Sequence, residues 1–360
     1  MSNNQEINQQ KVEQFVGQVV GDLGATVSSA LAHIGHRLGL YRAMAGAGPL
    51  TPAALAEKSG THERYVREWL SNQAAGGYVD YDPVPGTYEL SPEHAFVLAN
   101  EDSPVYMAAG LEQMAAIWAV EAKVEAVFQS GGGVAWHEQD PRFFGAYAAV
   151  MEPAYRTSFI DEWLPALEGV QERLAAGGRV ADVGCGHGAS AILLAQAFSS
   201  ATVTGFDSHA DSIEAARRRA AETGLGGDDR LTFEIGAACE YPVPDHGYDL
   251  ICFVDSFHEF GDPVGAAAHA REAVAEDGAV MLVELRSEDH IEENLHPVGR
   301  LAYGMSAFVC TPNSLSQEGG YALGGQAGPT AIGEIFEEAG FTRFRRAATS
   351  PLHQILEARP

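Results

Sequence analysis

The glycine-rich segment Asp182-Val-Gly184-Cys-Gly186-His-Gly188 has a composition that points directly to chemistry. It follows an apolar run typical of a strand and opens a run typical of a helix. Glycines in such a turn let the backbone approach a ligand closely. Asp207 ends the next predicted strand, nineteen residues after Gly188, where a carboxylate can accept both hydroxyls of a ribose. These residues predict a nucleotide site at the carboxyl edge of a sheet.

Two kinds of nucleotide cofactor use this geometry. The dinucleotide fingerprint is GxGxxG, and it directs a helix N-terminus at a pyrophosphate. Here the third glycine comes one residue earlier, and Asp182 stands two residues before the first glycine. A carboxylate is unfavourable beside a pyrophosphate but favourable beside the ammonium group of a methionine moiety. The motif therefore favours S-adenosylmethionine over NAD; the alternative is a tight turn that binds no ligand.

Strands and helices alternate around this motif, from residue 178 to the end of the chain. Predicted strands cover residues 179–184, 201–207, 231–235, 248–255 and 278–284, and helices fall between most of them. This alternation predicts an α/β fold with a parallel sheet covered by helices on both faces. The last two strands, 341–347 and 352–358, are separated by a short turn and must pair antiparallel.

The sequence before residue 103 has a different pattern. A helix is predicted over residues 11–38, where apolar residues recur every three or four positions as one stripe. Shorter helices are predicted to begin at Thr51-Pro52 and at the cap Thr61, the latter ending at Gly76-Gly77. Two short strands flank Pro85-Gly86. Helix, helix and hairpin in that order is the winged-helix pattern.

The chain therefore divides into three predicted parts. Residues 1–102 hold the winged helix, preceded by a disordered tail over residues 1–10. Residues 103–175 have helical patterns interrupted by a glycine loop, and we expect them to form a connector and a substrate lid. Residues 176–360 form the cofactor-binding sheet domain.

Composition excludes several classes of protein. Hydrophobic residues make up 46% of the chain, enough for a buried core, so global disorder is excluded. The formal net charge of −27 opposes binding to phosphate backbones, and we expect no nucleic-acid partner. The four cysteines form no CxxC pair, and His258-Glu259 lacks the second histidine of a zinc helix, so no metal is expected. Without a signal sequence or a run of about 18 apolar residues, we expect a cytoplasmic protein with no membrane contact.

Four segments carry a family resemblance: VADVGCGHGAS, VTGFDSHADSIEAAR, YDLICFVDSFHEFGDP and GAVMLVE. They resemble the successive motifs of class I S-adenosylmethionine-dependent methyltransferases, and the similarity covers residues 178–360. RYVREWLSNQAAGGYV and the hairpin after it resemble the winged-helix domain of a mycobacterial-type subfamily, which is similar to small-molecule O-methyltransferases. The resemblance implies a Rossmann-like seven-stranded sheet with an antiparallel last strand, and S-adenosylhomocysteine as the product.

It also implies a set of cofactor-binding residues, which are Asp182, Gly184, Gly186, Gly188, Asp207, Ser208, Ala238 and Phe253. One departure from the family pattern concerns adenine. After the third strand the family often has Gly-Asp-Ala, whose aspartate contacts the adenine amino group. This chain has Gly236-Ala237-Ala238 instead, so adenine must be held in another way.

Methyl transfer requires alignment of a nucleophile and, where that nucleophile is a hydroxyl, removal of its proton. By resemblance His258 is the base, and Glu284 is an acid that orients it. A second orienting acid of the family would fall near residues 328–330, where none is present. The alternatives are that His258 only shapes the pocket and that Glu284 is an ordinary strand-end residue.

An enclosed apolar cavity is expected for the acceptor, which we expect to be a small, partly apolar molecule. Candidate lining residues are Trp136, Met151, Tyr155, Tyr303 and Met305, each of which could instead belong to the core. A homodimer through the N-terminal part is expected, because its long apolar stripe exceeds what a small winged helix can cover. Two other functions stay open: a winged-helix transcriptional regulator with S-adenosylmethionine as effector, and a catalytically silent cofactor-binding protein.

Overall fold

The computed structural model describes residues 7–360, which divide into two compact units. The smaller unit comprises Met1–Trp118 and Pro141–Pro153, and the larger comprises Ala119–Asp140 and Ala154–Pro360. The predicted connector, residues 103–175, is thus shared between the two units. Its role as a lid stays a prediction.

The N-terminal helix α1 (Gln9–Arg37) begins two residues earlier than expected. The Asn8 side chain accepts a hydrogen bond from the backbone N–H of Lys11 at 3.2 Å and caps it. Residues 9 and 10 are therefore helical, which corrects the predicted tail, while residues 1–6 lie outside the described part of the chain. The apolar stripe of α1 is largely exposed, since Phe15 and Leu23 retain 64% and 63% of their surface.

Among the described residues, α1 alone is long and apolar enough to cross a membrane, with a mean hydropathy of 1.2 over an 18-residue window. We expected no segment that is long and apolar enough to cross a membrane, and α1 is an exception to that expectation. Signal sequences and the core helices of soluble proteins share this length and composition. Only 6% of that window is buried, so α1 is not a core helix of its own unit.

The winged-helix elements follow in the expected order: α2 (Leu40–Met44), α3 (Pro52–Ser59), α4 (Glu63–Ala75), β1 (Asp80–Asp82), β2 (Thr87–Glu89) and α5 (Pro92–Leu98). Thr51 caps α3 as predicted. The predicted cap of α4 was wrong, because His62 accepts from the backbone of Arg64 while the Thr61 hydroxyl bonds to Ser59. The hairpin β1–β2 is antiparallel.

The next segment is mainly helical: α6 (Gly110–Ala119), α7 (Glu121–Ser130), η1 (Trp136–Glu138), α8 (Arg142–Ala154), η2 (Tyr155–Trp163), η3 (Leu164–Ala166) and α9 (Val170–Ala175). Of these, η2 is a π-helix, a rare conformation that often occurs near functional sites. It begins at Tyr155, two residues after Pro153, which lies inside α8. A proline there removes a helical donor and so favours a change of helix type.

Seven strands form the sheet of the larger unit: β3 (Arg179–Val183), β4 (Thr202–Asp207), β5 (Leu231–Ile235), β6 (Tyr248–Val254), β7 (Val274–Leu285), β8 (Arg343–Thr349) and β9 (His353–Arg359). Their order is β5-β4-β3-β6-β7-β9-β8. Strand β9 pairs antiparallel with both neighbours, and the other pairings are parallel. The predicted α/β fold with an antiparallel last strand is confirmed.

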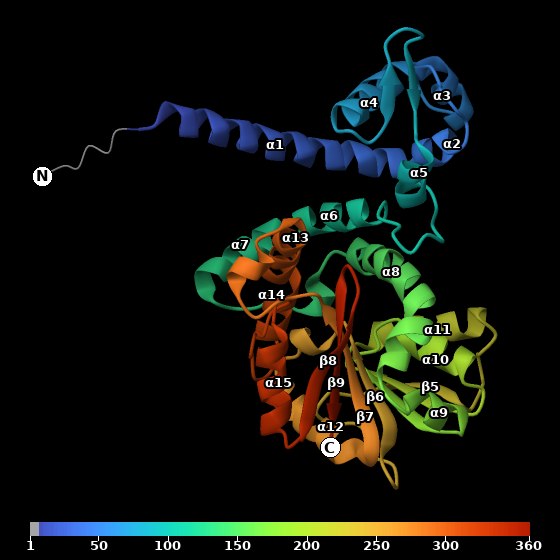
Figure 1. Ribbon diagram of the computed structural model, residues 1–360, viewed down its shortest axis with the longest axis vertical. Helices are drawn as coiled ribbons and strands as arrows, with labels where there is room; N and C mark the ends of the chain where they lie inside the picture. The colour runs from blue at the N-terminus through green and yellow to red at the C-terminus, as the bar shows by residue number, and fades with distance from the viewer. Residues whose placement is uncertain (1–6) are drawn as a thin grey trace, which may run out of the picture. The chain divides into compact units, whose positions relative to one another are not determined.

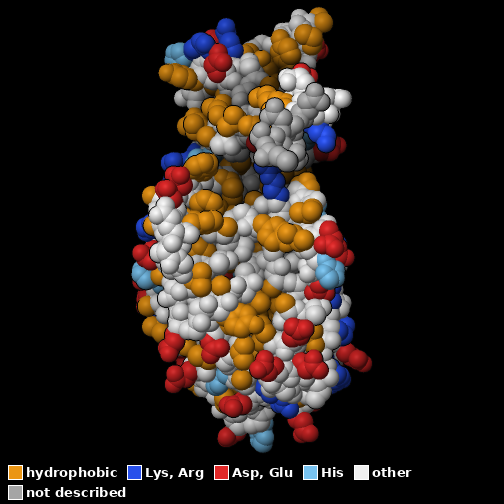
Figure 2. Space-filling view, turned by 90° about the vertical axis from the view of Figure 1, so that its left-hand side faces the viewer, with side chains coloured by type: hydrophobic (Ala, Val, Ile, Leu, Met, Phe, Trp, Pro, Cys, Tyr) orange, Lys and Arg blue, Asp and Glu red, His pale blue; other side chains and the backbone are white. Residues whose placement is uncertain are grey.

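Helices and turns complete this unit: α10 (Ala189–Ala197), α11 (Ala210–Glu222), η4 (Phe257–Glu259), α12 (Pro263–Ala273), η5 (Ile291–Asn294), α13 (Pro297–Met305), η6 (Ser306–Cys310), α14 (Thr311–Leu315) and α15 (Pro329–Glu338). In Figure 1, α12 and α15 lie on one side of the sheet, and α9, α10 and α11 on the other. Successive residues Ile251, Cys252 and Phe253 of β6 are all fully buried, as expected of a strand covered on both faces. Figure 2 shows acidic side chains spread over the outer surface, consistent with the net charge of −27.

Candidate active site

The glycine-rich segment connects β3 to α10 at the carboxyl edge of the sheet. Gly184, Gly186 and Gly188 have φ values of +72°, +52° and +78°. Residues with a side chain rarely adopt this left-handed conformation, so the turn depends on glycine at all three positions. The local sequence thus explains why the strand can reverse into a helix within a few residues.

The three glycines have different surroundings. A Cβ atom at Gly184 would lie 2.6 Å from the Cβ of Ser256, and one at Gly188 would lie 2.7 Å from the ring of Phe233. At Gly186 nothing lies within 4 Å. Gly184 and Gly188 are therefore required by the packing of the protein itself, whereas Gly186 leaves backbone open to a ligand.

Asp182 lies beneath this loop and is completely buried. Its Oδ2 accepts a hydrogen bond from the Ser190 hydroxyl at 2.6 Å, which ties β3 to the first turn of α10. Oδ1 has no partner among residues 7–360. Burial raises the pKa of Asp182 to about 6, and the nearby Asp207 adds to this effect. With only Oδ2 hydrogen-bonded among these residues, the charged form of this buried acid would be favoured by a cation nearby.

Asp207 ends β4 beside the loop. Its Oδ2 accepts from the backbone N–H of Gly186, and its Oδ1 accepts from that of His209, both at 2.8 Å. Burial raises the pKa of Asp207, although these two hydrogen bonds oppose the shift. Each oxygen retains a second lone pair, so the fixed carboxylate can still accept hydroxyl donors. The Asp207 carboxylate, which is predicted to bind ribose, is therefore held in place at the edge of the open loop.

His258 and Glu284 meet as the family resemblance implied. The carboxylate of Glu284, near the end of β7, contacts His258 Nδ1 and accepts from the backbone N–H of Phe257 at 3.1 Å. Both side chains are buried. Burial by itself would lower the pKa of His258, but the adjacent Glu284 raises it well above the ordinary value. The catalytic role of the pair stays a prediction, while its contact is present.

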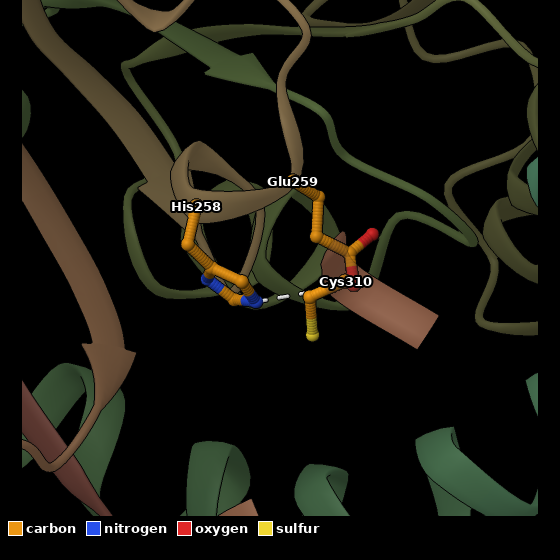
Figure 3. A group of neighbouring side chains, drawn as sticks. All are labelled: His258, Glu259 and Cys310. Carbon is orange, nitrogen blue, oxygen red and sulfur yellow. Dashed lines mark ion pairs between the residues drawn. The ribbon is translucent and has the colours of Figure 1, made fainter. Parts of the chain in front are cut away.

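Two further groups lie beside the other ring nitrogen. His258 Nε2 is 3.8 Å from Glu259 Oε1, and the thiol of Cys310 belongs to the same cluster, as Figure 3 shows. Cys310 ends η6 and lies 52 residues after His258 in the chain. Burial raises the pKa of Cys310 to about 11, although His258 opposes this. The cluster was not predicted from the sequence, because Cys310 is far along the chain from the adjacent His258 and Glu259.

A second buried polar cluster surrounds Asp255, which directly follows β6. The hydroxyl of Tyr155 donates to Asp255 Oδ2, and His353 Nε2 lies 3.1 Å from the same oxygen. Asp255 has φ +49°, a left-handed conformation uncommon for a residue with a side chain. Burial favours the neutral acid, but His353 and Tyr155 outweigh it and lower the pKa of Asp255. Tyr155 was expected to line the substrate cavity; its hydroxyl bonds to Asp255, and its place in such a cavity stays a prediction.

The remaining predicted cofactor residues differ in accessibility. Ser208 is exposed after β4, and Ala238 is half-buried in the loop after β5. Phe253 is completely buried, with its ring packed against those of Phe257 and Phe260. Its contact with a cofactor therefore stays a prediction, and its observed role is in the core. The Gly236-Ala237-Ala238 stretch offers no side-chain donor, as the sequence had indicated.

The predicted acceptor-binding residues come from several segments. Tyr303 and Met305 lie on α13, and Trp136 begins η1. The loop around Trp136 packs on the segment after α13, because the Val134 backbone N–H donates to the Pro312 carbonyl at 3.0 Å. Met151 belongs to the smaller unit. An acceptor cavity lined by these residues stays a prediction.

Acidity is the common feature of this sheet edge. Five carboxyl groups gather where β3, β4, β6 and β7 end: Asp182, Asp207, Asp255, Glu259 and Glu284. Asp255 and Glu284 each contact a histidine, so it is chiefly Asp182 and Asp207 whose charge would oppose a pyrophosphate and favour a ligand that carries positive charge. The glycine loop has open backbone, and the Asp207 carboxylate can accept hydrogen bonds from hydroxyl groups. Together with the negative charge, these features suit a positively charged nucleoside.

Two family models match the chain. The Rv2258c-like winged helix-turn-helix domain matches residues 26–100, and a methyltransferase domain matches residues 174–340. The predicted winged-helix and methyltransferase domains are thereby confirmed.

Curated relatives match part of the chain. The 27-O-demethylrifamycin SV methyltransferase of Amycolatopsis mediterranei is 34% identical over 145 residues, which cover 40% of this chain and 44% of that protein. The fatty-acid O-methyltransferase of Mycolicibacterium smegmatis is 43% identical over 82 residues, covering 23% and 28%. The chain thus spans less than half the length of these relatives.

Solved structures share the whole fold. Human N-acetylserotonin methyltransferase, solved with S-adenosylmethionine, superposes with a TM-score of 0.65 at 17% identity and covers 100% of this chain and 99% of its own. Identity this low shows a common fold alone.

We expect Tyr155→Phe to destabilise the protein by about 1–3 kcal/mol at neutral pH, because buried Asp255 loses a donor. The pKa of Asp255 is lower in the folded state, so its stabilising contribution exists above the unfolded value of about 3.9 and is lost as pH falls through the folded value. The difference between wild type and variant should therefore shrink on acidification. Urea denaturation at about pH 7 and at about pH 2, where the folded carboxyl is also protonated, measures it.

Tyr65→Phe, at a tyrosine that is 78% exposed, is the matched control and should change little at either pH. A Tyr155→Phe effect that is absent, or that is equal at the two pH values, would contradict the assigned hydrogen bond to an ionised Asp255.

Proposed function

Because this chain joins an Rv2258c-like winged helix-turn-helix domain to a methyltransferase domain, we propose that it transfers a methyl group from S-adenosylmethionine to an oxygen of a small, partly apolar molecule. The open backbone at Gly186, beside the buried Asp182 and the half-buried Asp207, is the observation that carries the proposal. When bound, S-adenosylmethionine supplies a methyl group on a positively charged sulfur that is already an activated leaving group. The names of the curated relatives support oxygen as the acceptor atom.

The chain's own residues would bind and orient the cofactor. Asp207 would accept the ribose hydroxyls, since its carboxylate is fixed by two backbone donors. Asp182, whose Oδ1 lacks a partner among the described residues, would favour the cationic methionine end through its field. Gly186 would allow close approach of the backbone. S-adenosylhomocysteine would leave as product.

His258 would take the acceptor's proton where the acceptor is a hydroxyl. Glu284 holds Nδ1, which leaves Nε2 as the nitrogen that would take the proton, and its carboxylate would stabilise the ring cation formed by the transfer. The same carboxylate raises the pKa of His258, so the charged ring is favoured before the transfer as well. An acceptor that needs no deprotonation would leave His258 only a role in shaping the pocket.

The N-terminal part would serve dimerisation in a cytoplasmic homodimer. The apolar stripe of α1 is exposed, and the same stripe of a second copy would bury it.

DNA binding is not part of the proposal. On α4, Arg64 pairs with Glu68 at 2.5 Å and Arg67 with Glu63 at 2.6 Å, so few unopposed cations remain for phosphates. A catalytically silent protein would bind the cofactor without forming S-adenosylhomocysteine.

Asp207→Ala should weaken binding of S-adenosylhomocysteine at least about 100-fold, because two charge-assisted hydrogen bonds of about 1.5–3 kcal/mol each are at stake. Isothermal calorimetry measures the affinity. Asp211→Ala, an exposed acid in the first turn of α11, is the matched control. Equal affinity in wild type and Asp207→Ala would refute the ribose assignment.

His258→Gln should lower turnover by about 10²–10⁴-fold while affinity for S-adenosylhomocysteine stays nearly unchanged, if the acceptor is a hydroxyl. Glutamine preserves polarity and approximate size but cannot act as a base at neutral pH. Formation of S-adenosylhomocysteine from a panel of small phenols and alcohols is the measurement. Near-normal turnover of a hydroxyl acceptor by the variant would assign His258 to the pocket wall.

Charges in the α1 stripe should dissociate the dimer. Val20 and Leu23 are 61% and 63% exposed, so replacing both by aspartate should not disturb the fold of the monomer. Light scattering should then give the mass of one chain, whereas Val84→Asp, at an exposed valine of the hairpin, should leave a dimer. A wild-type monomer at micromolar concentration would exclude the dimer, and sedimentation of the wild type with lipid vesicles would favour a membrane as the cover.

A further inference from the structure

Three side chains converge beside the candidate active site and together offer ligands of three kinds. His258 and Glu259 lie in the short turn η4, and Cys310 ends η6, a π-helical turn. Their ligating atoms all lie within 4.8 Å of one another. Figure 3 shows the three side chains as neighbours that come from two separate elements. We propose that His258, Glu259 and Cys310 form a binding site for a zinc ion.

Neighbouring residues already orient two of these ligands. Glu284 holds Nδ1 of His258, so Nε2 is the nitrogen left to face Glu259 and Cys310. The Asn313 amide donates to Glu259 Oε2 at 3.2 Å, which leaves Oε1 facing His258. A histidine that donates its second N–H to a carboxylate, and a carboxylate held by a hydrogen bond, are typical of metal sites in proteins. The cluster is thus preorganised by residues that bind no metal themselves.

The ligand atoms, which lie within 4.8 Å of one another, would have to close to tetrahedral spacing to bind zinc. Zinc bonds of about 2.0–2.3 Å place tetrahedral ligand atoms about 3.3–3.8 Å apart. His258 Nε2 and Glu259 Oε1 are 3.8 Å apart. The Cys310 thiol would lose its proton to solvent on binding, and the thiolate and carboxylate would together cancel the charge of the ion. Three protein ligands leave the fourth position for water.

The donor set also selects the metal. Magnesium and calcium take oxygen ligands, whereas a thiolate beside an imidazole suits zinc and its spectroscopic substitute cobalt. The sequence showed no zinc pattern because Cys310 is far along the chain from His258 and Glu259. The fold alone brings the third ligand to the first two.

The site does not rest on the proposed function, but it bears on it. Zinc would occupy Nε2 of His258, the same nitrogen that would take a proton from a hydroxyl acceptor. A chain with zinc bound could not use His258 as a base, so the ion would inhibit that reaction rather than assist it.

Cobalt and zinc titrations of the full-length, tag-free protein test the site directly. After treatment with a chelator, one equivalent of Co²⁺ should produce the near-ultraviolet absorption of a thiolate–cobalt bond, and Zn²⁺ should abolish it. Cys310→Ser should lose this absorption, whereas Cys239→Ser, at the exposed cysteine, should retain it. Thermal denaturation without metal checks that each variant is folded.

Two carboxylate variants keep the test decisive if Cys310→Ser does not fold. Calorimetry with Zn²⁺ should show about 10–100-fold weaker binding in Glu259→Gln and in Glu284→Gln. No stoichiometric metal binding by wild type, or cobalt absorption that survives in Cys310→Ser, would overturn the proposal. Because no turnover is measured, failure of methyl transfer would overturn the proposed function and leave the zinc site standing.

Discussion

The contact of Glu284 with the loop after β6 fixes the geometry on which the candidate site depends. One of its oxygens accepts from the backbone of Phe257, and the other contacts the ring of His258. A single carboxylate thus sets both the path of the turn and the orientation of the imidazole. Every role considered for His258 requires its other nitrogen to have a defined direction. The buried position of Glu284 makes that direction rigid, because the alternative is an unpaired charge in the core.

Accumulated negative charge is the second constraint. Asp182 and Asp207 are held next to one another under a glycine loop, and burial raises the pKa of both. The folded protein therefore keeps an unfavourable arrangement that a cationic ligand would relieve. At the proposed cofactor site, this repulsion would favour a positively charged ligand over water. The same field explains why a pyrophosphate would be a poor occupant.

Much of the fold could be predicted because its signals are local. Alternating strands and helices, three glycines at a strand end and Asp207 at the next strand end lie within short windows of sequence. The pairing of Glu284 with His258 was reachable only through family resemblance. The approach of Cys310 to His258 and of Tyr155 and His353 to Asp255 joins residues far apart in sequence, so no pattern of spacing could reveal them. The cap of α4 was missed because histidine is an uncommon capping residue, and Thr61 was already bonded to Ser59.

The division of the chain into units has a practical consequence. The smaller unit contains Pro141–Pro153, a segment inserted between two parts of the larger one, so the backbone passes from one unit to the other three times. No single cleavage or truncation can separate them. A fragment beginning after Trp118 would retain the inserted helix without the residues it packs against in its own unit, exposing its apolar face. Dissecting this protein will therefore require substitutions within the intact chain or an excision with a designed bridge.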